Sequence, residues 1–438
     1  MAITVGFDFG THQTKVCYET SEAGTLFYEV FRFVDSYGDE KTTLPSFIRL
    51  CSDGTLRYGH EGLETDVDQP AVTYFKQIMF SWTVAPAARA EAEVWSVLYL
   101  AYAIFRLDAK LGRAYRIQMG MPTDADPDHY RFCKGQAVKV MAAAMLMARS
   151  VIKNDLRTFL GMRREDLKEM AAKCLSVVPA NLQDVRKRFP ILVFPEAYVA
   201  LIPLINDHKL PEIGPNLFVD IGGGTVDISF FTNQMDDSIG QNRPCLYQYS
   251  SVPCGLNMIT GQDLKSSHNV EISQGQITRQ CVDRFQAELL TTVTSMMQIL
   301  RDEYVRQGRT SVMPFSNICG QILDRRPICY SGGGSMFSSL KLPLSDSRLG
   351  LNYNFSHVTT VSELIDHSKL YVSDKMFHVL ATAFALSHQS LIADMREAQE
   401  PDSIKLVSVV RLFSGVVIPR SYEESIAPRW VRPKRRTW

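Results

Sequence analysis

The sequence contains no long apolar run and no paired cysteine motif. No stretch approaches the ~18 consecutive apolar residues of a membrane span, and the N-terminal MAITVGFDFG has no charged start ahead of an apolar segment. The nine cysteines are scattered, odd in number and without a CxxC pair. They are expected to be reduced core residues rather than a disulfide or zinc framework, among them Cys17, Cys51, Cys245 and Cys329. These absences predict a cytoplasmic protein with no membrane segment.

Charge of one sign is not in excess either. The chain has 47 Lys and Arg against 47 Asp and Glu, and 45% of its residues are hydrophobic. This balance argues against a disordered protein and against general nucleic-acid binding. One basic cluster, RPKRRTW at residues 432–438, is expected to be a solvated tail, with docking on an acidic partner as the alternative. We expect no direct nucleic-acid contact apart from a role for this tail.

Two common nucleotide-binding motifs are missing as well. There is no GxxxxGK[ST] loop, and no GxGxxG opens a βαβ unit. The 438 residues nevertheless exceed the roughly 100–200 of a typical domain. The length predicts two domains or one duplicated domain.

A short pattern occurs twice, about half a chain apart. VGFDFGTHQTKV at residues 5–16 aligns with LFVDIGGGTVDI at residues 217–228, so that Asp8 corresponds to Asp220 and Gly10 to Gly222. Each copy has an apolar strand, an Asp, a glycine-containing turn with Thr, and a second strand. The repetition favours a duplicated domain whose copies share this hairpin.

The two hairpins have the composition of an anion site. Glycine permits turns in which successive N–H groups converge on a phosphate, and an aspartate at the strand end can hold Mg²⁺ through water. Taken singly, each segment can also be an ordinary glycine turn with a nearby Asp.

A third glycine cluster, ICYSGGGSMFSSL at residues 328–340, has a different context. A short apolar strand precedes the glycines and a helix is expected after them. Such a unit favours the phosphate or sugar edge of a nucleotide. Its candidate contacts are Gly332, Gly333, Gly334 and Ser335.

The order of these motifs resembles a known superfamily. The hairpin DFGTHQTK, a strand ending in PEA, the hairpin DIGGGTVD and the late SGGGS are similar to the ATPases of the actin, sugar-kinase and 70-kDa heat-shock chaperone superfamily. The resemblance spans residues 3 to about 390. It is nearest to the chaperone nucleotide-binding domain, in DIGGGTVDIS and in TLPSFIRLCSDGTLRYGHEGL at residues 43–63. It implies an α/β protein with a duplicated ribonuclease-H-like (actin-like ATPase) fold and two lobes around a nucleotide cleft.

The resemblance also implies roles for individual residues. Asp8 and Asp220 match the acids that organise Mg²⁺ through water, and Glu196 matches the acid beside the attacking water. Lys76 stands where the chaperones have a lysine near the γ-phosphate. The implied phosphate-loop residues are Gly10, Thr11, Gly222, Gly223, Gly224 and Thr225, and Gly333 and Gly334 match the adenosine loop.

Several of these residues have alternative interpretations. Lys76 can be a solvated helix lysine, Glu196 can merely favour its helix N-terminus, and Asp227 can be a hydrogen-bonding group rather than a metal contact. His12 stands where the chaperones have a threonine, so one hydroxyl contact to phosphate is expected to be either missing or replaced by an imidazole donor. Lys15 resembles the phosphate-contacting lysine of actin and of plasmid-segregation actin-like proteins.

The implied organisation has three parts. Residues 1–215 form a first lobe with an inserted subdomain at about 30–85. Residues 216–400 form a second lobe with an inserted helical subdomain at about 258–318, and residues 401–438 are a C-terminal extension. Helical spacing is expected in the segment of some seventy residues between MGMPT and VFPEA, whose AAAMLM run favours core over a partner groove. Residues 276–307 are expected to form one long helix, in which no adenine clamp is recognisable.

The resulting functional hypothesis is a slow, Mg²⁺-dependent ATP hydrolase that acts as a conformational switch. It would resemble the chaperone motor without a client-binding domain, because the residues after the helix at 374–398 are too few for a client-binding β-sandwich. A filament-forming actin-like ATPase of the cytoskeletal or segregation kind is the alternative, and a small-molecule kinase is a third. ATP or ADP and Mg²⁺ are the expected cofactors, with a protein partner or self-association.

Overall fold

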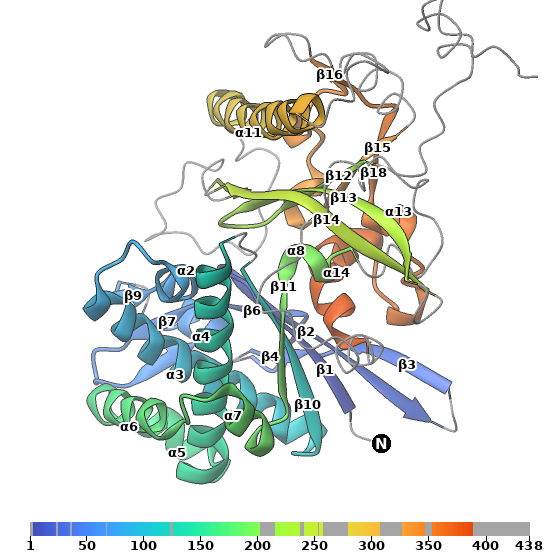
Figure 1. The fold of residues 1–438 in the computed structure, drawn as a ribbon. Helices are drawn as coiled ribbons and strands as arrows, with labels where there is room; N and C mark the ends of the chain where they lie inside the picture. The colour runs from blue at the N-terminus through green and yellow to red at the C-terminus, as the bar shows by residue number, and fades with distance from the viewer. Residues whose placement is uncertain are drawn as a thin grey trace, which may run out of the picture.

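The computed structural model describes residues 3–22, 25–35, 37–66, 68–122, 126–201, 215–236, 241–252, 254–256, 279–306, 326–346 and 353–388. Within these ranges the chain is a mixed α/β protein organised around two main sheets (Figure 1). The α/β class expected from the sequence is confirmed.

The first sheet is built around the N-terminal hairpin. Its strand order is β11-β10-β1-β2-β3, with β6 (Thr43–Pro45) also pairing with β2. β10 is parallel to β1 and β11 is parallel to β10, whereas β2 and β3 are antiparallel to their neighbours. The strands are β1 (Ile3–Phe9), β2 (Gln13–Glu22), β3 (Thr25–Val30), β10 (Tyr115–Met121) and β11 (Ile191–Pro195).

The second sheet repeats this arrangement. Its order is β14-β13-β12-β15-β18, with β15 parallel to β12, β18 parallel to β15, and β13 and β14 antiparallel. When β12 is matched with β1, the two sheets have the same order and the same strand directions. The strands are β12 (Asn216–Ile221), β13 (Val226–Asp236), β14 (Gln241–Val252), β15 (Pro327–Ser331) and β18 (His357–Thr360).

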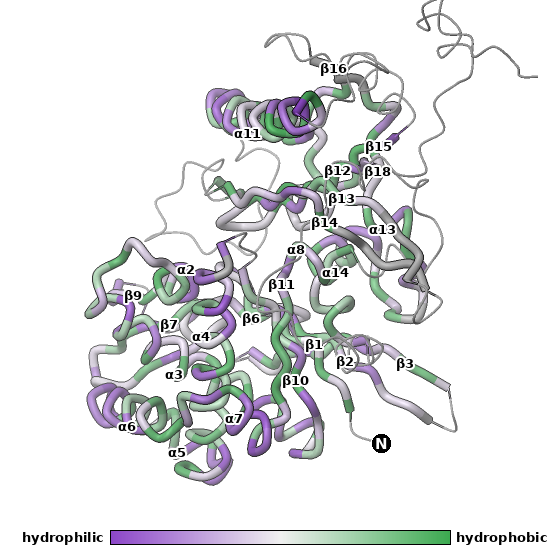
Figure 2. Tube along the Cα trace, in the orientation of Figure 1, coloured by the Kyte–Doolittle hydropathy of each residue, from purple (hydrophilic) through white to green (hydrophobic). Residues whose placement is uncertain are grey.

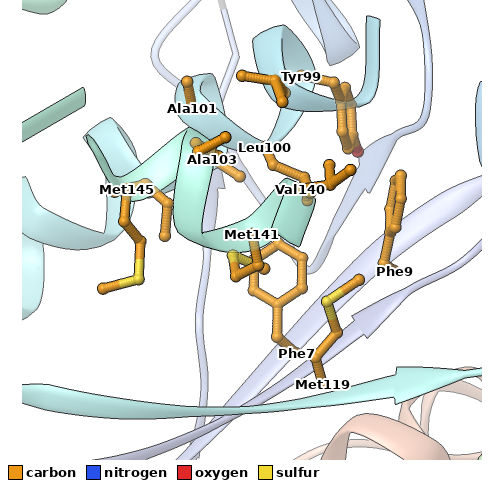
Figure 3. Close-up of a cluster of buried hydrophobic side chains, with 14 of the residues drawn as sticks. Phe7, Phe9, Tyr99, Leu100, Ala101, Ala103, Met119, Val140, Met141 and Met145 are labelled. Atoms are coloured by element: carbon orange, nitrogen blue, oxygen red, sulfur yellow. The ribbon is translucent and has the colours of Figure 1, made fainter. Parts of the chain in front are cut away.

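Two long helices cover one face of the first sheet. α3 (Pro86–Leu111) and α4 (Pro127–Leu146), which continues into a π-helical turn (Met147–Val151), form a core with the apolar side chains of β1 and β10. Figure 3 shows Phe7 and Phe9 of β1 beside α3 and α4 residues such as Tyr99 and Met141. Residues 142–145 of the AAAMLM run are completely or almost completely buried, so their expected core role is confirmed.

Shorter elements surround this core. α5 (Leu156–Gly161), α6 (Arg164–Val177) and α7 (Leu182–Arg188) follow α4, so the segment before β11 is helical as expected. The elements between β3 and α3 include a small sheet in the order β8-β7-β9. They are β4 (Phe33–Val34), β5 (Glu40–Lys41), β7 (Ile48–Leu50), β8 (Leu56–Tyr58), α1 (Gly59–Glu64), β9 (Ala71–Val72) and α2 (Phe75–Phe80).

One long helix covers one face of the second sheet. α11 (Arg279–Arg306) confirms the expected long helix over these residues, and the rest of residues 276–307 lies outside the described part. Apolar and polar residues are mixed along α11 in Figure 2, and its buried residues, such as Phe285 and Val293, join the core of the second sheet. This pattern is typical of a helix with a single buried face.

The last described helix, α14 (Asp374–Ser387), lies between the two sheets (Figure 1). Phe377 and Leu380 of α14 share a core with Phe218 and Cys329 of the second sheet, together with α13 (Val361–Leu364). Its last turn packs on Phe194 of the first sheet. α14 therefore connects the two sheets through apolar contacts.

The third glycine cluster differs from the expectation. In place of the predicted helix, two short 3₁₀ turns follow β15, at Gly333–Met336 and Ser338–Leu340. Consecutive glycines have poor helix propensity, which explains why an α-helix does not begin here. Further on in the chain are two short strands, β16 (Ser345–Asp346) and β17 (Tyr353–Asn354), and a 3₁₀ turn at Ser368–Leu370.

None of the described helices combines the length and the apolar composition that a membrane span requires. The basic tail and the extension at 401–438 lie outside the described residues, as does most of the expected subdomain at 258–318 apart from α11.

Candidate functional site

The turns of the two repeated hairpins lie against each other. We call residues 10–12, between β1 and β2, the Thr11 turn, and residues 222–225, between β12 and β13, the triple-glycine turn. A Cβ built at Gly223 would lie 2.4 Å from His12 Cδ2, and one at Gly224 would lie 3.0 Å from Thr11 Cγ2. The two segments that the sequence paired as repeats are thus in direct contact, although about half the chain separates them.

Bare backbone in the triple-glycine turn permits this contact. The turn is closed by a hydrogen bond from Gly222 N to Thr225 O (2.9 Å), and Gly223 and Gly224 lie at its tip. Any side chain at either position would overlap atoms of the Thr11 turn or of α2, because real Cβ atoms do not approach other heavy atoms below about 3 Å. The glycines therefore permit the close approach of the two hairpins.

The two hairpins carry different charges at equivalent positions. In the first, Asp8 lies opposite Lys15 in the β1–β2 register, and Lys15 Nζ donates to Asp8 Oδ2 at 3.0 Å. In the second, Asp220 lies opposite Asp227. Asp227 therefore takes the place of Lys15, and an acid–base pair in one copy becomes an acid–acid pair in the other.

A second lysine approaches the site from α2. Lys76 is only 6% exposed, and its Nζ donates to Glu196 Oε1 at 2.8 Å. Glu196 is the first residue of α8 (Glu196–Val199), directly after β11. The alternative of a solvated Lys76 is wrong. Glu196 does begin a helix, as its alternative interpretation states. Its carboxylate also accepts a hydrogen bond from the buried Lys76, so it is not only a helix N-terminal residue.

The two acids of the second hairpin have raised pKa values. Burial and the charge of Asp227 raise the pKa of Asp220 to about 7, and Asp8 and Glu196 act in the same direction. Burial and Glu196 raise the pKa of Asp227 to about 6, against hydrogen bonds from Ser251 and Thr225.

The nearby carboxylates also change the pKa of the buried Lys76. Burial alone would lower the pKa of Lys76, but the charges of Glu196, Asp8 and Asp227 raise it above its ordinary value. Carboxyl groups from both hairpins and from the end of β11 therefore act on one another, and Lys76 provides positive charge among them.

The third glycine cluster lies beside the second hairpin, because β15 pairs with β12 and Asp220 lies opposite Ser331. Gly332 has a positive φ of 79°, and a Cβ there would lie 2.2 Å from Asp220 Oδ1. The Oγ of Ser335 donates to Gly332 O at 2.7 Å, which stabilises the turn. At Gly333 a Cβ would meet its nearest atoms only at 3.7 Å, so this glycine faces more open space. A Cβ at Gly334 would overlap Ile221 Cγ2, so Gly334 packs closely on β12.

The structure also adds residues that the sequence motifs did not indicate. Ser46 donates its backbone N–H to His12 O and its hydroxyl to Gly10 O, both at 2.7 Å, which holds the Thr11 turn. The Nε2 of Gln77, next to Lys76 on α2, lies 2.8 Å from a Cβ built at Gly224. A Cβ at Gly120, near the end of β10, would lie 2.8 Å from Glu196 Cγ. Ser46 belongs to the quoted segment TLPSF and Gly120 to MGMPT, but neither pattern indicated the contacts of these residues.

Direct metal ligation is not apparent in the described part of the chain, where no three His, Cys, Asp or Glu side chains converge as ligands. Neither a protein-family model nor a curated protein matches this chain. The geometry of the site and the motifs themselves are therefore what indicates a function.

Proposed function

We propose that this protein is a slow, Mg²⁺-dependent ATP hydrolase of the actin, sugar-kinase and 70-kDa heat-shock chaperone superfamily, working in the cytoplasm as a conformational switch. Its two lobes would be copies of a ribonuclease-H-like fold. One observation carries the proposal: two sheets with the same strand order and directions bring the turns of their equivalent hairpins together.

The nucleotide phosphates would bind between the Thr11 turn and the triple-glycine turn. Glycine amides at such turns bind anions, and Lys15 and Lys76 supply positive charge that offsets the charge of a transferring phosphoryl group. The residues 332–335 lie beside Asp220 and are proposed to contact the nucleoside side of the ligand.

The acid cluster fits a divalent cation. Burial and neighbouring acids raise the pKa of Asp220 and of Asp227, so a cation that lowered the repulsion between these carboxyl groups would be favoured. Because Mg²⁺ in phosphate sites keeps several waters and uses one or two carboxylates, a direct three-carboxylate cage is not required. Asp8 and Asp220 would hold it through water, and it would neutralise charge on the phosphates.

Glu196 is the proposed residue for the hydrolytic water. Its carboxylate lies at the end of β11, accepts a hydrogen bond from Lys76, and remains partly open to solvent. A carboxylate in this position can orient a water and accept its proton while Lys76 stabilises the phosphoryl oxygens. Loss of the terminal phosphate would remove ligand contacts between the two turns and release the lobes.

Phosphate release from ATP, measured with and without Mg²⁺, tests this proposal. Asp8→Ala and Glu196→Ala should each lower turnover, by a factor on the order of 10²–10³ if the lost group contacts the reacting atoms. Glu169→Ala is the matched control, because Glu169 lies on α6 with an exposed side chain. If neither site variant lowers turnover, the site assignment is wrong.

A filament-forming actin-like ATPase is the second candidate. Two features support it: Lys15, whose spacing from Asp8 resembles that of the actin lysine, contacts Asp8, and the helices α4 to α7 form a long segment before β11. ATP-dependent pelleting at high protein concentration would support filaments, and its absence would remove this candidate. A product other than ADP and free phosphate would instead favour a small-molecule kinase.

A further inference from the structure

Glu196 has a close neighbour on the adjacent strand. In the parallel pairing of β10 with β11, Gly120 lies opposite Phe194 and Met121 lies opposite Pro195, directly before Glu196. Because side chains alternate along a strand, Gly120 shares a face with Gln118, and Met119 and Met121 point into the α3–α4 core. Gln118 donates to His388 O at 2.9 Å, so this face looks toward the end of α14.

The space at Gly120 is taken by one side chain. A Cβ built there would lie 2.8 Å from Cγ, 3.0 Å from Oε1 and 3.3 Å from Cδ of Glu196. These three nearest atoms all belong to a side chain with rotatable bonds, and none belongs to the backbone. Gly120 lies within a β-strand, whose backbone conformation any residue adopts. A methyl group at this position would therefore move the Glu196 carboxylate rather than the strands.

Lys76 fixes the same carboxylate from another direction. Its buried ammonium group contacts Oε1, the oxygen that a Cβ at Gly120 would approach to 3.0 Å. The position of Oε1 thus depends on two features at once, a donor on α2 and a missing side chain on β10.

We propose that Gly120 is a positioning residue for the hydrolytic step, because its bare Cα leaves the space in which Lys76 holds the Glu196 carboxylate. The inference rests on the proposed ATPase function and on Glu196 as the residue that orients water. A catalytic group displaced by about 1 Å can lose a factor on the order of 10² in rate, whereas nucleotide contacts made by the two turns are unaffected.

The first experiment compares steady-state ATP turnover in four proteins: wild type, Gly120→Ala, Glu196→Ala and the double variant. Gly120→Ala should lower kcat by roughly 10- to 100-fold with KM for ATP within about threefold of wild type. The double variant should turn over ATP at the rate of Glu196→Ala alone, since that substitution removes all three overlapping atoms. Gly135→Ala on α4 is the control, because its added Cβ meets no described heavy atom within 4 Å apart from its chain neighbours and the backbone of its own helix, and its kcat should be unchanged.

The outcomes separate the inference from the proposed function. A normal kcat in Gly120→Ala, with turnover lost in Glu196→Ala, overturns the role of Gly120 and leaves the ATPase assignment standing. Unchanged turnover in Glu196→Ala, or no turnover in wild type, overturns both.

A measurement independent of activity tests the contact itself. Gly120→Ala should lower the Tm of the otherwise wild-type protein and should lower it less, or raise it, in the Glu196→Ala background, where alanine in a strand is favourable. Equal decreases in both backgrounds would show that the methyl group meets something other than Glu196, and the proposal would be wrong.

Discussion

At the scale of single residues, the second hairpin concentrates negative charge where the first hairpin neutralises it. Asp8 is paired with Lys15, but Asp220 lies opposite Asp227. Ionising both Asp220 and Asp227, which lie on adjacent strands in a partly buried site, costs free energy. The pair therefore retains one proton near neutral pH. The pair therefore needs a proton or a cation.

This retained proton predicts a pH dependence of stability. The folded protein, without Mg²⁺, keeps a proton on Asp220 up to pH about 7, whereas the unfolded chain releases it near its ordinary pKa of about 3.9. The folded state thus binds more protons between these values, and its stability falls as pH rises from about 4 to about 7. Asp220→Asn removes this loss, so it should be more stable than wild type at pH 8, by about 1–3 kcal/mol, with partial solvent access limiting the gain.

Urea denaturation in EDTA at pH 5 and pH 8 provides the measurement. The advantage of Asp220→Asn should shrink at pH 5, where the wild-type carboxyl is already protonated. An equal difference between the variants at both pH values would contradict the retained proton.

Lys76 provides a second prediction, because its ammonium group is buried beside Glu196. Lys76→Met keeps most of the side-chain volume but leaves the Glu196 carboxylate without its cation. Stability should fall by about 1–2 kcal/mol, less than for a fully buried pair because Glu196 is partly exposed, and ATP turnover should fall by a factor on the order of 10². Lys173→Met, which removes an exposed i,i+4 pair with Glu169, should change stability by at most about 0.5 kcal/mol. Equal effects of the two substitutions on stability and turnover would refute this role for Lys76.

The sequence predicted some site contacts and missed others for a physical reason. The hairpins of Asp8 and Asp220 are local, so their strands and turns follow from the residues within each segment. The contacts of Gln77 with Gly224 and of Gly120 with Glu196 join segments that are far apart in the chain. A local pattern contains no information on which glycine another side chain will approach, and these contacts appear only when the sheets are assembled.

At the scale of elements, the long periodic helices were predicted well, whereas the short helix expected after the third glycine cluster was not. α11 and α4 are long helices with apolar residues on a buried face. Both lie in segments where the sequence predicted helix. The prediction of a helix after the third glycine cluster is wrong, because the structure has 3₁₀ turns there. In a segment with three glycines, tertiary contacts with Ile221 and Asp220 decide the backbone path more than propensity does.

The packing of α14 on β1 predicts a strong effect at Gly6. A Cβ at Gly6 would lie 2.2 Å from Ala383 O and 2.4 Å from Ser387 N, which are backbone atoms of a helix and cannot move singly. Gly6→Ala should therefore force α14 away from the first sheet and cost about 1–3 kcal/mol or more. The Tm compared with that of Gly135→Ala provides the measurement, since added methyl groups have opposite surroundings at the two sites. Similar Tm values would mean that α14 does not pack closely on β1 in solution.

At the scale of the whole molecule, the chain forms layers in which α3 and α4, the first sheet, α14, the second sheet and α11 follow one another. Among the described residues, the sheets meet through apolar contacts of α14 (Figure 1) and of Ala200 and Leu201 after α8, and through the facing turns. The apolar α14 contact is fixed by packing, whereas the turns meet through glycines and polar side chains. A ligand that binds between the turns can therefore change the second contact without unfolding the first.

The difference between the apolar α14 contact and the polar contact of the turns predicts where a bound nucleotide slows amide hydrogen exchange. A ligand held by both turns should slow amide hydrogen exchange in residues 10–13 and 222–226 together, with a smaller effect in α14, whose contacts are already buried. ATP with Mg²⁺, added to the slowly hydrolysing Glu196→Ala variant to preserve the ligand, should protect both segments, and ADP with Mg²⁺ should protect residues 10–13 and 222–226 less. Asp8→Ala should lose protection in both segments at once, because a phosphate that lacks its cation on one side is released from the other side too. Exchange measured by mass spectrometry would contradict the two-turn site if protection remained confined to one hairpin, or if α14 changed while the turns did not.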